Sequence, residues 1–434
     1  MISDEEIKEE VTELLSKLIR IDTTNPPGNE TPAAELLYDY LSSEGYEPEI
    51  LEYVKGRGNL ITSLKGEGKT RLMLLSHLDV VPADPRKWRV HPFSGEVRDG
   101  FIWGRGAHDC KGLAACEAVA MAILKREGFK PKGEVIFAAT ADEERGALAG
   151  ARWLVEAHPE KVRVDYMINE GGGLVLPIKG KNHYFVQVAE KGVFWIKLRT
   201  RGRSAHSSMP KAGVNALMKM VEVLHKLGLY KPPSVPTKEV KEFLRRIVGE
   251  FESVEEAIAR LEREGPWLAE GVRTNMMITM VPTMIKAGIK ENVIPDECET
   301  VVDCRLPADF GLDYLKDQLR KALGSLEDVE IEVIGADPGT SSPYDTIFFR
   351  KIEESVSKFD PGAVCVPSTS NGGTDSRFFR AKFGTIAYGF RVTKLDVPLD
   401  EFRRMVHGVD ERISQENLVY RTKMLVDIVK RVMG

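Results

Sequence analysis

The sequence contains little glutamine and no long apolar run. Glutamine occurs only at positions 187, 318 and 415, although lysine, arginine and glutamate are abundant. That balance is typical of thermophilic proteins. No apolar segment approaches the roughly 20 residues needed to cross a bilayer, so no membrane partner is expected.

Cysteine is also scarce, and its spacing is uninformative. The five cysteines show no CxxC pair, and their number is odd: Cys110, Cys116, Cys298, Cys304 and Cys365. The first 20 residues are acidic and helical in pattern, without the apolar core of a secretory leader. These features predict free thiols and a cytoplasmic location.

Strong positive charge is absent as well. The net charge is -5, which argues against a nucleic-acid partner. Hydrophobic residues make up 42% and charged residues 29% of the chain, as in a globular protein. A chain of 434 residues exceeds one ordinary core, so two domains are expected.

One glycine-rich stretch, residues 104–112 (GRGAHDCKG), lies directly before a helical pattern at 113–125. Its glycines indicate a loop in which the chain turns tightly or another group approaches closely. Asp109 lies within this loop. Taken alone, an aspartate there is more simply explained as a helix cap than as a ligand.

Other polar side chains recur where apolar strands end. The strands expected at 71–75, 133–140 and 164–168 are continuous apolar runs, which are typical of an α/β sheet buried on both faces. The groups that follow them are His77, Asp79, Glu143, Glu144 and Glu170. Ligands bind outside the carboxyl ends of such strands. We therefore expect an oxygen-rich site for two divalent cations bridged by one carboxylate, with His407 as the best candidate for a second imidazole.

At these residues the chain resembles a known family. It is similar to the dinuclear-zinc aminoacylase, acetylornithine deacetylase, succinyl-diaminopimelate desuccinylase and glutamate carboxypeptidase family, and looks closest to its carboxypeptidase S and N-acyl-amino-acid hydrolase branch. The motifs are SHLDVVP, GRGAHDCKG, TADEERG, NEGGG, GRSAHSSMP, ENVIPDE, GGTDSRFF and HGVDERI. The resemblance covers nearly the whole chain, from His77 to His407.

The resemblance implies a role for each site residue. Asp109 would bridge two metal ions, one also bound by His77 and Glu170 and the other by Glu144 and His407. Zinc is the default metal, and a carboxylate-rich shell also suits cobalt or manganese. Asp79 would orient His77, and Glu143 would be the general base that takes a proton from water and returns it to the leaving amine.

The middle of the chain has a different pattern. Alternation at 193–200, further strands at 274–281, 299–305 and 329–334, and helices at 215–227 and 313–323 predict a ferredoxin-like β-α-β-β-α-β module. We expect this module, residues 192–336, to be inserted between the two catalytic segments, 1–191 and 337–434. Residues 229–270 form a predicted helical extension, which either widens an acyl pocket or thickens a dimer interface.

Several residues of this region are assigned only by the resemblance. His206 would stabilise the tetrahedral oxyanion, commonly in the site of a partner subunit, so a homodimer through the insert is expected. Asn292 and Arg305 would bind a substrate carboxylate, for which the planar fork of arginine is suited. A strand-surface ion pair is the alternative for Arg305. Gly373 and Thr374 would line the pocket with backbone.

Asp109 is flanked by His108 and Cys110. Cys110 stands where the family usually has methionine, and we interpret it as a packing residue rather than a ligand. His108 is interpreted as a loop histidine. The resemblance also implies a cis peptide between Asp109 and Cys110.

The sequence thus predicts an α/β metallohydrolase of the zinc-peptidase type that cuts an amide bond next to a free carboxylate. One reading is a carboxypeptidase or dipeptidase acting on small peptides. The alternative is an N-acyl-amino-acid deacylase. A third reading is a non-catalytic metal-binding protein on the same fold, although the base Glu143 and every predicted ligand are present.

Overall fold

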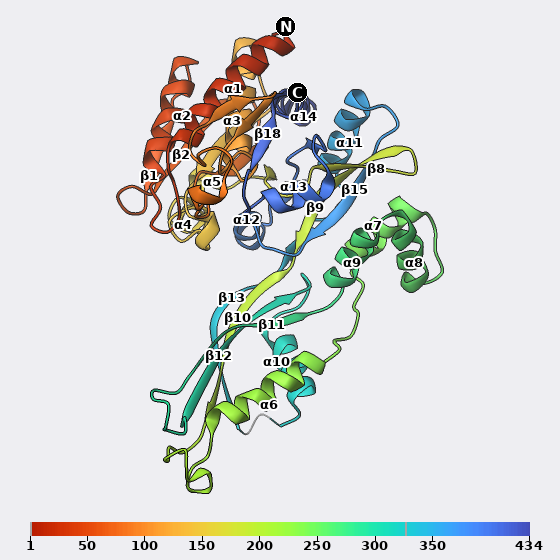
Figure 1. Ribbon diagram of the computed structural model, residues 1–434. Coiled ribbons are helices and arrows are strands. Elements are labelled where there is room, and N and C mark those ends of the chain that lie inside the picture. The colour runs from red at the N-terminus through yellow and green to blue at the C-terminus, as the bar shows by residue number, and fades with distance from the viewer. Residues whose placement is uncertain (1, 326–327) are drawn as a thin grey trace. The chain divides into compact units, whose positions relative to one another are not determined.

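The computed structural model describes residues 2–325 and 328–434 (Figure 1). The chain forms two compact units. The first contains the residues up to 188 together with 342–368 and 374–434, and the second contains 189–341 and 369–373. Among the described residues, no helix combines the length and apolarity that a membrane crossing requires.

The first unit is built on a large sheet with the strand order β1-β2-β6-β3-β7-β16-β9-β8-β17, and β15 also pairs with β9. The short strand β14 pairs with Ala189 and Glu190 at the end of β9, and these residues belong to the second unit. The strands β6, β3, β7 and β16 at its centre run parallel. The bounds are β1 (Glu49–Glu52), β2 (Gly58–Lys65), β3 (Arg71–His77), β6 (Glu134–Thr140), β7 (Tyr166–Asn169), β8 (Leu174–Ile178), β9 (Lys181–Glu190), β14 (Thr340–Ser341), β15 (Val364–Ser370), β16 (Ile386–Gly389) and β17 (Thr393–Lys394).

Helices cover both faces of this sheet, which confirms the predicted α/β class. Helices α1, α3 and α14 pack together on one face, and α4 and α12 contribute to the core on the other (Figure 1). The bounds are α1 (Asp4–Arg20), α2 (Thr31–Ser43), α3 (Lys111–Arg126), α4 (Ala151–Ala157), α5 (Pro159–Val162), α11 (Ile347–Phe359), α12 (Ser376–Phe383), α13 (Leu399–Met405) and α14 (Gln415–Met433). The central strands are apolar because they are covered twice: Leu72 to Leu75 on β3 are fully buried.

A small second sheet in the first unit has the order β18-β5-β4, with bounds β4 (Glu96–Arg98), β5 (Phe101–Trp103) and β18 (Arg412–Ser414). Short 3-10 turns occur at η1 (Pro85–Lys87), η2 (Glu143–Arg145) and η3 (Pro210–Ala212), the last of these in the second unit. The small sheet joins two segments that are distant in the sequence, because Arg412 pairs with Trp103. It thereby brings the loop before α14 close to the glycine-rich loop before α3.

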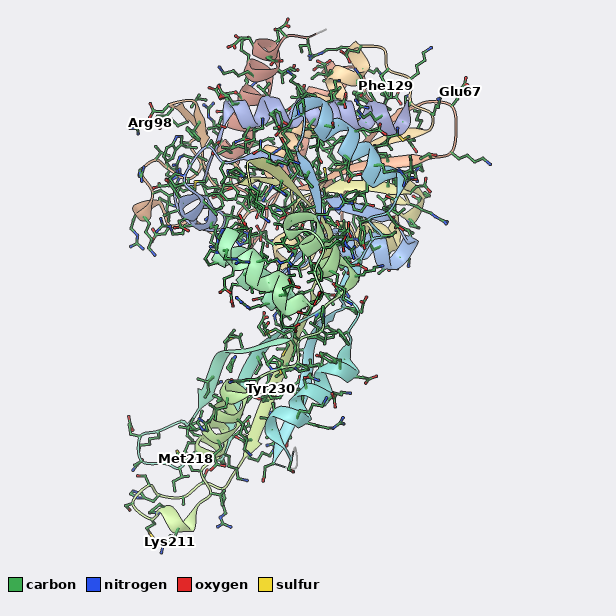
Figure 2. All side chains as sticks on the ribbon, turned by 90° about the vertical axis from the view of Figure 1, so that its right-hand side faces the viewer. Glu67, Arg98, Phe129, Lys211, Met218 and Tyr230 are labelled. Carbon is green, nitrogen blue, oxygen red and sulfur yellow. The ribbon has the colours of Figure 1, made fainter. Side chains whose placement is uncertain are left out.

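The second unit is a four-stranded antiparallel sheet, order β11-β12-β10-β13, with two helices on one face. The bounds are β10 (Gly192–Arg201), α6 (Ala216–Leu229), β11 (Thr279–Ala287), β12 (Glu297–Leu306), α10 (Leu312–Leu323) and β13 (Val329–Asp337). On β10 the alternate residues Phe194, Ile196 and Leu198 are buried under the helices. This order confirms the ferredoxin-like module. Met218 lies on the exposed side of α6 (Figure 2).

The boundary between the extension and β11 differs from the prediction. The strand expected at 274–281 begins only at Thr279, because α9 (Pro266–Asn275) continues into that range. The predicted helical extension consists of three helices, α7 (Lys238–Val248), α8 (Val254–Glu264) and α9. Gly249, with φ of 82°, ends α7 in the left-handed region that glycine favours.

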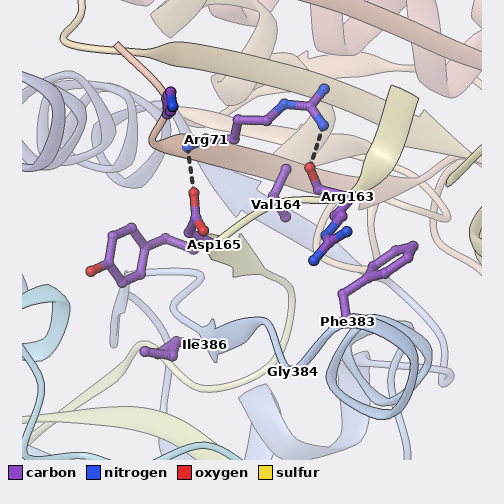
Figure 3. Close-up of a pocket in the computed structure, with 9 residues that line it drawn as sticks. Arg71, Arg163, Val164, Asp165, Phe383, Gly384 and Ile386 are labelled. Atoms are coloured by element: carbon purple, nitrogen blue, oxygen red, sulfur yellow. Dashed lines mark hydrogen bonds between the residues drawn. The ribbon is translucent and has the colours of Figure 1, made fainter. Parts of the chain in front are cut away.

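A pocket of about 400 Å³ opens where β3, β7 and β16 begin (Figure 3). Arg71 lines it but is committed to the fold. Its backbone N–H group donates to the Asp165 carboxylate at 2.8 Å, and its guanidinium donates to the backbone carbonyl of Arg163. Ligands of such sheets bind at the opposite, carboxyl ends of the strands, so the functional site is expected there and not in this pocket.

Candidate metal centre

Two sets of metal-binding side chains adjoin each other in the first unit. One set is formed by His77, Asp109, Cys110 and Glu170, and the other by Asp109, Glu144 and His407. Within each set, one ligand atom from every residue lies within 4.8 Å of the others. The structure therefore brings together all five side chains that the sequence analysis proposed as ligands, and Asp109 belongs to both sets.

The two oxygens of Asp109 face different histidines. Oδ1 lies 3.3 Å from Nε2 of His77, and Oδ2 lies 3.3 Å from Nε2 of His407. His77 Nε2 is also 3.5 Å from Oε2 of Glu170. His407 Nε2 is 3.2 Å from Oε1 of Glu144. This geometry suits one carboxylate bridging two cations.

The fold explains how residues distant in sequence meet here. His77 is the last residue of β3, and Glu170 follows directly after β7, so the parallel pairing of these strands brings the two together. Asp109 lies two residues before α3, and Glu144 lies in η2, just after β6. The common location is the carboxyl edge of the sheet.

Asp79 connects several residues of this edge through hydrogen bonds. It is fully buried, and its carboxylate accepts the backbone N–H groups of Glu143 and Glu144, at 3.0 and 3.2 Å. Nδ1 of His77 lies 3.0 Å from the carbonyl oxygen of Asp79 and 3.4 Å from its carboxylate Oδ1. Both the backbone and the side chain of Asp79 thus fix the imidazole so that Nε2 faces Asp109.

The donor set fits divalent cations. Oε1 of Glu144 is buried, and its neighbour there is Nε2 of His407 at 3.2 Å. A buried carboxylate oxygen is costly unless a positive charge neutralises it, and a bound cation would do so. Burial raises the pKa of Glu143 and of Glu170, and the charge of Glu170 raises that of Glu143 further. Crowded carboxylates of this kind with two imidazoles are suited to zinc, manganese or cobalt.

The loop that carries Asp109 is held by a residue that the sequence analysis missed. Glu411 is fully buried and accepts the N–H groups of His108 and Asp109 at 2.7 and 3.0 Å. Its other oxygen accepts a hydrogen bond from Arg105 at 2.7 Å and from the N–H of Gly106 at 3.1 Å. In the sequence, the pair is indicated only by opposite charges in two motifs: Arg105 lies in GRG and Glu411 lies in DER.

Arg391 was also missed. Its Nη1 donates to the carbonyl of His108 and lies 3.3 Å from Oδ1 of Asp109. It follows two residues after β16, a strand-end position like those of the predicted ligands. The guanidinium partly neutralises the carboxylates of the centre.

The neighbours of Asp109 differ in part from expectation. The Asp109–Cys110 peptide is cis, as the resemblance implied. Cys110 is buried, but its sulfur also lies within ligand range of the His77 set, which our interpretation as a packing residue did not include. His108 lies in the loop before α3, in line with its interpretation as a loop histidine. It is fully buried there and packs edge-on against Phe402, with ring centroids 5.2 Å apart.

The remaining predicted residues lie mostly in the second unit. His206, Asn292, Arg305 and Gly373 belong to it, whereas Thr374 belongs to the first. Nδ2 of Asn292 is 3.4 Å from Nε2 of His206, and Nδ1 of His206 is 2.7 Å from Oγ of Ser208. Arg305 makes the ion pair considered in its alternative reading, with Nε donating to Asp303 at 2.6 Å.

Asp109 belongs to two ligand sets at the carboxyl edge of an α/β sheet, and Glu143 is adjacent in sequence to the ligand Glu144. This arrangement is that of a dinuclear metallohydrolase. Comparisons with known proteins agree. Residues 73–431 match peptidase family M20/M25/M40. The chain belongs to this family and is a metal-dependent hydrolase of amide bonds.

Named relatives fall into two groups. The chain is 26% identical to N-fatty-acyl-amino acid synthase/hydrolase PM20D1 of Xenopus tropicalis, over 98% of this chain and 86% of the relative. It is 28% identical to the probable carboxypeptidase S-like 2 of Dictyostelium discoideum, over 88% of this chain and 75% of the relative.

Solved structures share the fold. An M20 family metallo-carboxypeptidase from Sulfolobus solfataricus superposes with a TM-score of 0.77 at 20% identity, covering 97% of this chain and 98% of that chain. The dipeptidase Dug1p from Saccharomyces cerevisiae gives a TM-score of 0.72 at 16% identity, covering 99% and 96%.

Proposed function

We propose that the protein hydrolyses an amide bond next to a free carboxylate, as a metallo-carboxypeptidase or dipeptidase acting on small peptides. The observation that carries the proposal is the shared aspartate: the oxygens of Asp109 face His77 and His407 separately, each at 3.3 Å. Two cations held in this way suit amide hydrolysis, which needs both an activated water and a polarised carbonyl.

In this proposal Asp109 would hold two divalent metal ions. His77 and Glu170 would hold one of them as well, and Glu144 and His407 the other. Zinc is the expected metal, and cobalt or manganese would fit the same oxygen-rich set. When bound, the cations supply Lewis acidity, lowering the pKa of a water molecule and polarising the scissile carbonyl.

Glu143 is the proposed general base. It is adjacent in sequence to the ligand Glu144, and its backbone is tied to Asp79 at 3.0 Å, so its carboxylate has a fixed anchor beside the centre. It takes the proton of the attacking water and returns it to the leaving amine.

The substrate is proposed to be bound by residues assigned through family resemblance. Arg305 and Asn292 bind its carboxylate, the backbone at Gly373 and Thr374 lines the pocket, and His206 stabilises the oxyanion. We further propose a cytoplasmic homodimer in which His206 serves the partner's site.

A second candidate is an N-acyl-amino-acid deacylase. The observation that favours it is the naming of several relatives as N-fatty-acyl-amino acid synthase/hydrolases, at 26 to 28% identity. Such substrates carry the same carboxylate and amide as a dipeptide and differ on the acyl side.

A panel of Ala-Leu, N-acetyl-L-leucine and N-palmitoyl-L-leucine separates the two candidates. A peptidase releases leucine fastest from Ala-Leu, whereas a deacylase prefers one of the acyl substrates. Chelation should abolish the activity, and zinc, cobalt or manganese should restore it. Full activity in protein shown to be metal-free by elemental analysis would refute the proposed mechanism.

A further inference from the structure

Lys191, one residue before β10, is a buried cation without an acid partner. Its exposed fraction is 1%, and Nζ donates to the carbonyl oxygens of Thr274 and Met277, both at 2.8 Å. Across residues 2–325 and 328–434, no carboxylate forms an ion pair with it. A buried charge paired only with carbonyl dipoles is costly, so the fold retains it for some further interaction.

The strand register places Lys191 beside Arg305. Val193 on β10 pairs with Arg305 on β12, and Lys191 precedes Val193 by two residues. Side chains two apart on a strand share a face, so Lys191 and Arg305 are diagonal neighbours there. Burial and the charge of Arg305 lower the pKa of Lys191 to about 8, which agrees with this placement.

Arg305 alone does not supply a net positive charge. Its Nε and Nη2 donate to the two oxygens of Asp303 at 2.6 and 2.9 Å, so arginine and aspartate form a neutral pair. The indole N–H of Trp195 also donates to Asp303, at 2.9 Å, which fixes the carboxylate. Lys191 adds a positive charge next to this neutral pair.

Lys191 also links the helical extension, α7–α9, to the segment 369–373, which contains the predicted pocket residue Gly373. Its backbone N–H donates to the carbonyl of Ser370 at 3.0 Å, while its ammonium donates to the carbonyl of Thr274 at the end of α9. From α9, Nδ2 of Asn275 donates to the carbonyl of Thr369 at 3.0 Å. The extension, the segment 369–373 and the start of β10 are therefore linked by hydrogen bonds.

We propose that Lys191 is a positioning residue for the carboxylate of the substrate. It supplies the positive charge that makes the Arg305–Asp303 pair attractive to an anion, and it couples the α7–α9 extension to the segment that binds substrate. This inference rests on the proposed function, in which Arg305 binds the carboxylate.

The test compares Ala-Leu with its carboxamide, Ala-Leu-NH2, in metal-loaded full-length protein. In Lys191→Met we expect KM for Ala-Leu to rise about tenfold with kcat within about twofold, because one charge interaction across several ångströms is of this order. The preference for acid over amide should fall by the same factor. Lys191→Arg should restore both values.

Lys197→Met is the matched control, because Lys197 lies on the same face of β10 but already has acid partners, Glu299 at 4.0 Å and Glu332 at 3.7 Å. It should behave as the wild type. If Lys191→Met fails to fold, Asp303→Asn provides the opposite change and should increase the preference for acid over amide.

The outcomes are distinguishable. A wild type that cleaves no member of the substrate panel refutes the proposed function and this inference with it. An active wild type whose acid-over-amide preference is unchanged in Lys191→Met, or in Asp303→Asn where that variant replaces it, overturns the inference alone. A purely structural role would change kcat and stability without changing that preference.

Discussion

The carboxylate of Asp79 accepts the backbone N–H group of Glu143 at 3.0 Å, and its second oxygen accepts that of Glu144 at 3.2 Å. The same residue holds Nδ1 of His77 through its carbonyl oxygen. One buried aspartate thereby connects the end of β3 with the turn after β6. The proposed base and two proposed ligands depend on this connection.

Replacing Asp79 with alanine should therefore damage the centre without removing a ligand. Two backbone N–H groups and the amide of Asn25, which donates to Asp79 at 2.8 Å, would lose their acceptor. We expect a loss of about 2–4 kcal/mol in the free energy of unfolding, since each buried donor left unpaired costs about 1–3 kcal/mol. Denaturant unfolding measures this loss, and kcat should fall by about two orders of magnitude because Glu143 is no longer fixed.

Asp84→Ala is the control for Asp79→Ala. Asp84 lies nearby in sequence and pairs with Arg86 on the surface, at 2.9 Å. Removing such an exposed pair should change the free energy of unfolding by less than about 1 kcal/mol. Equal effects of the two substitutions would contradict the role that we assign to Asp79.

The adjacent glutamates should separate in their effects on metal content. Glu143→Ala should keep both metal ions and lose nearly all turnover, because a base is needed for chemistry and not for binding. Glu144→Ala should lose one metal ion, since its Oε1 lies 3.2 Å from His407. Elemental analysis with single-turnover kinetics measures both. If the two variants lose metal equally, the assignment of base and ligand is wrong.

Much of the fold and the outline of the site could be predicted from the sequence. The apolar strand 71–75 and the polar residue His77 that follows are adjacent in the chain, so their relation is visible without a structure. Parallel strands then bring such ends together. The alternation of apolar and polar residues along β10 similarly predicted a sheet with one buried face.

The contacts of the supporting residues could not be predicted, because opposite charges in two motifs do not show which residues pair when they are distant in the sequence. Arg105 and Glu411 are separated by 306 positions, and neither lies in a periodic pattern. The isolated lysine Lys191 resembled any surface lysine until its burial was known. The start of β11 was misplaced because residues 274–278 are apolar enough for a strand, although α9 already includes Thr274 and Asn275.

The exposed edge of the second unit predicts self-association. Strand β11 is at the edge of its sheet, and its residues Val281, Met284 and Ile285 are 53%, 68% and 54% exposed. An unpaired apolar edge is a liability unless another strand covers it. We expect light scattering to give the mass of a dimer, and Ile285→Asp to give a monomer.

Mixing two inactive variants tests whether sites are shared. Glu143→Ala and His206→Ala subunits, mixed in equal amounts and allowed to exchange, should regenerate about a quarter of the wild-type activity, because half of the dimers then carry one intact site. An active monomer, or no recovery after exchange proven by mass spectrometry, would rule out action of His206 in the partner's site.

Glu411 and Arg105 form a buried ion pair next to Asp109, the residue proposed to bridge the metal ions. Glu411 accepts N–H groups from both His108 and Asp109, and its other oxygen neutralises Arg105 at 2.7 Å. In Glu411→Gln the new amide has one acceptor oxygen for these donors and leaves the guanidinium without a counter-charge. We expect a loss of about 3 kcal/mol in the free energy of unfolding and weaker binding of metal, which calorimetric titration of the metal-free protein measures.

Adding Arg105→Met to Glu411→Gln should recover part of that loss, because the unpaired buried cation is then removed as well. The recovery gives the coupling energy of the pair in a double-mutant cycle. Glu416→Gln, an exposed residue in the first turn of α14, serves as the control and should leave both stability and metal binding unchanged. If Glu411→Gln binds metal as tightly as the wild type, the position of Asp109 does not depend on Glu411, and other contacts of the loop, such as those of Arg391, must hold it.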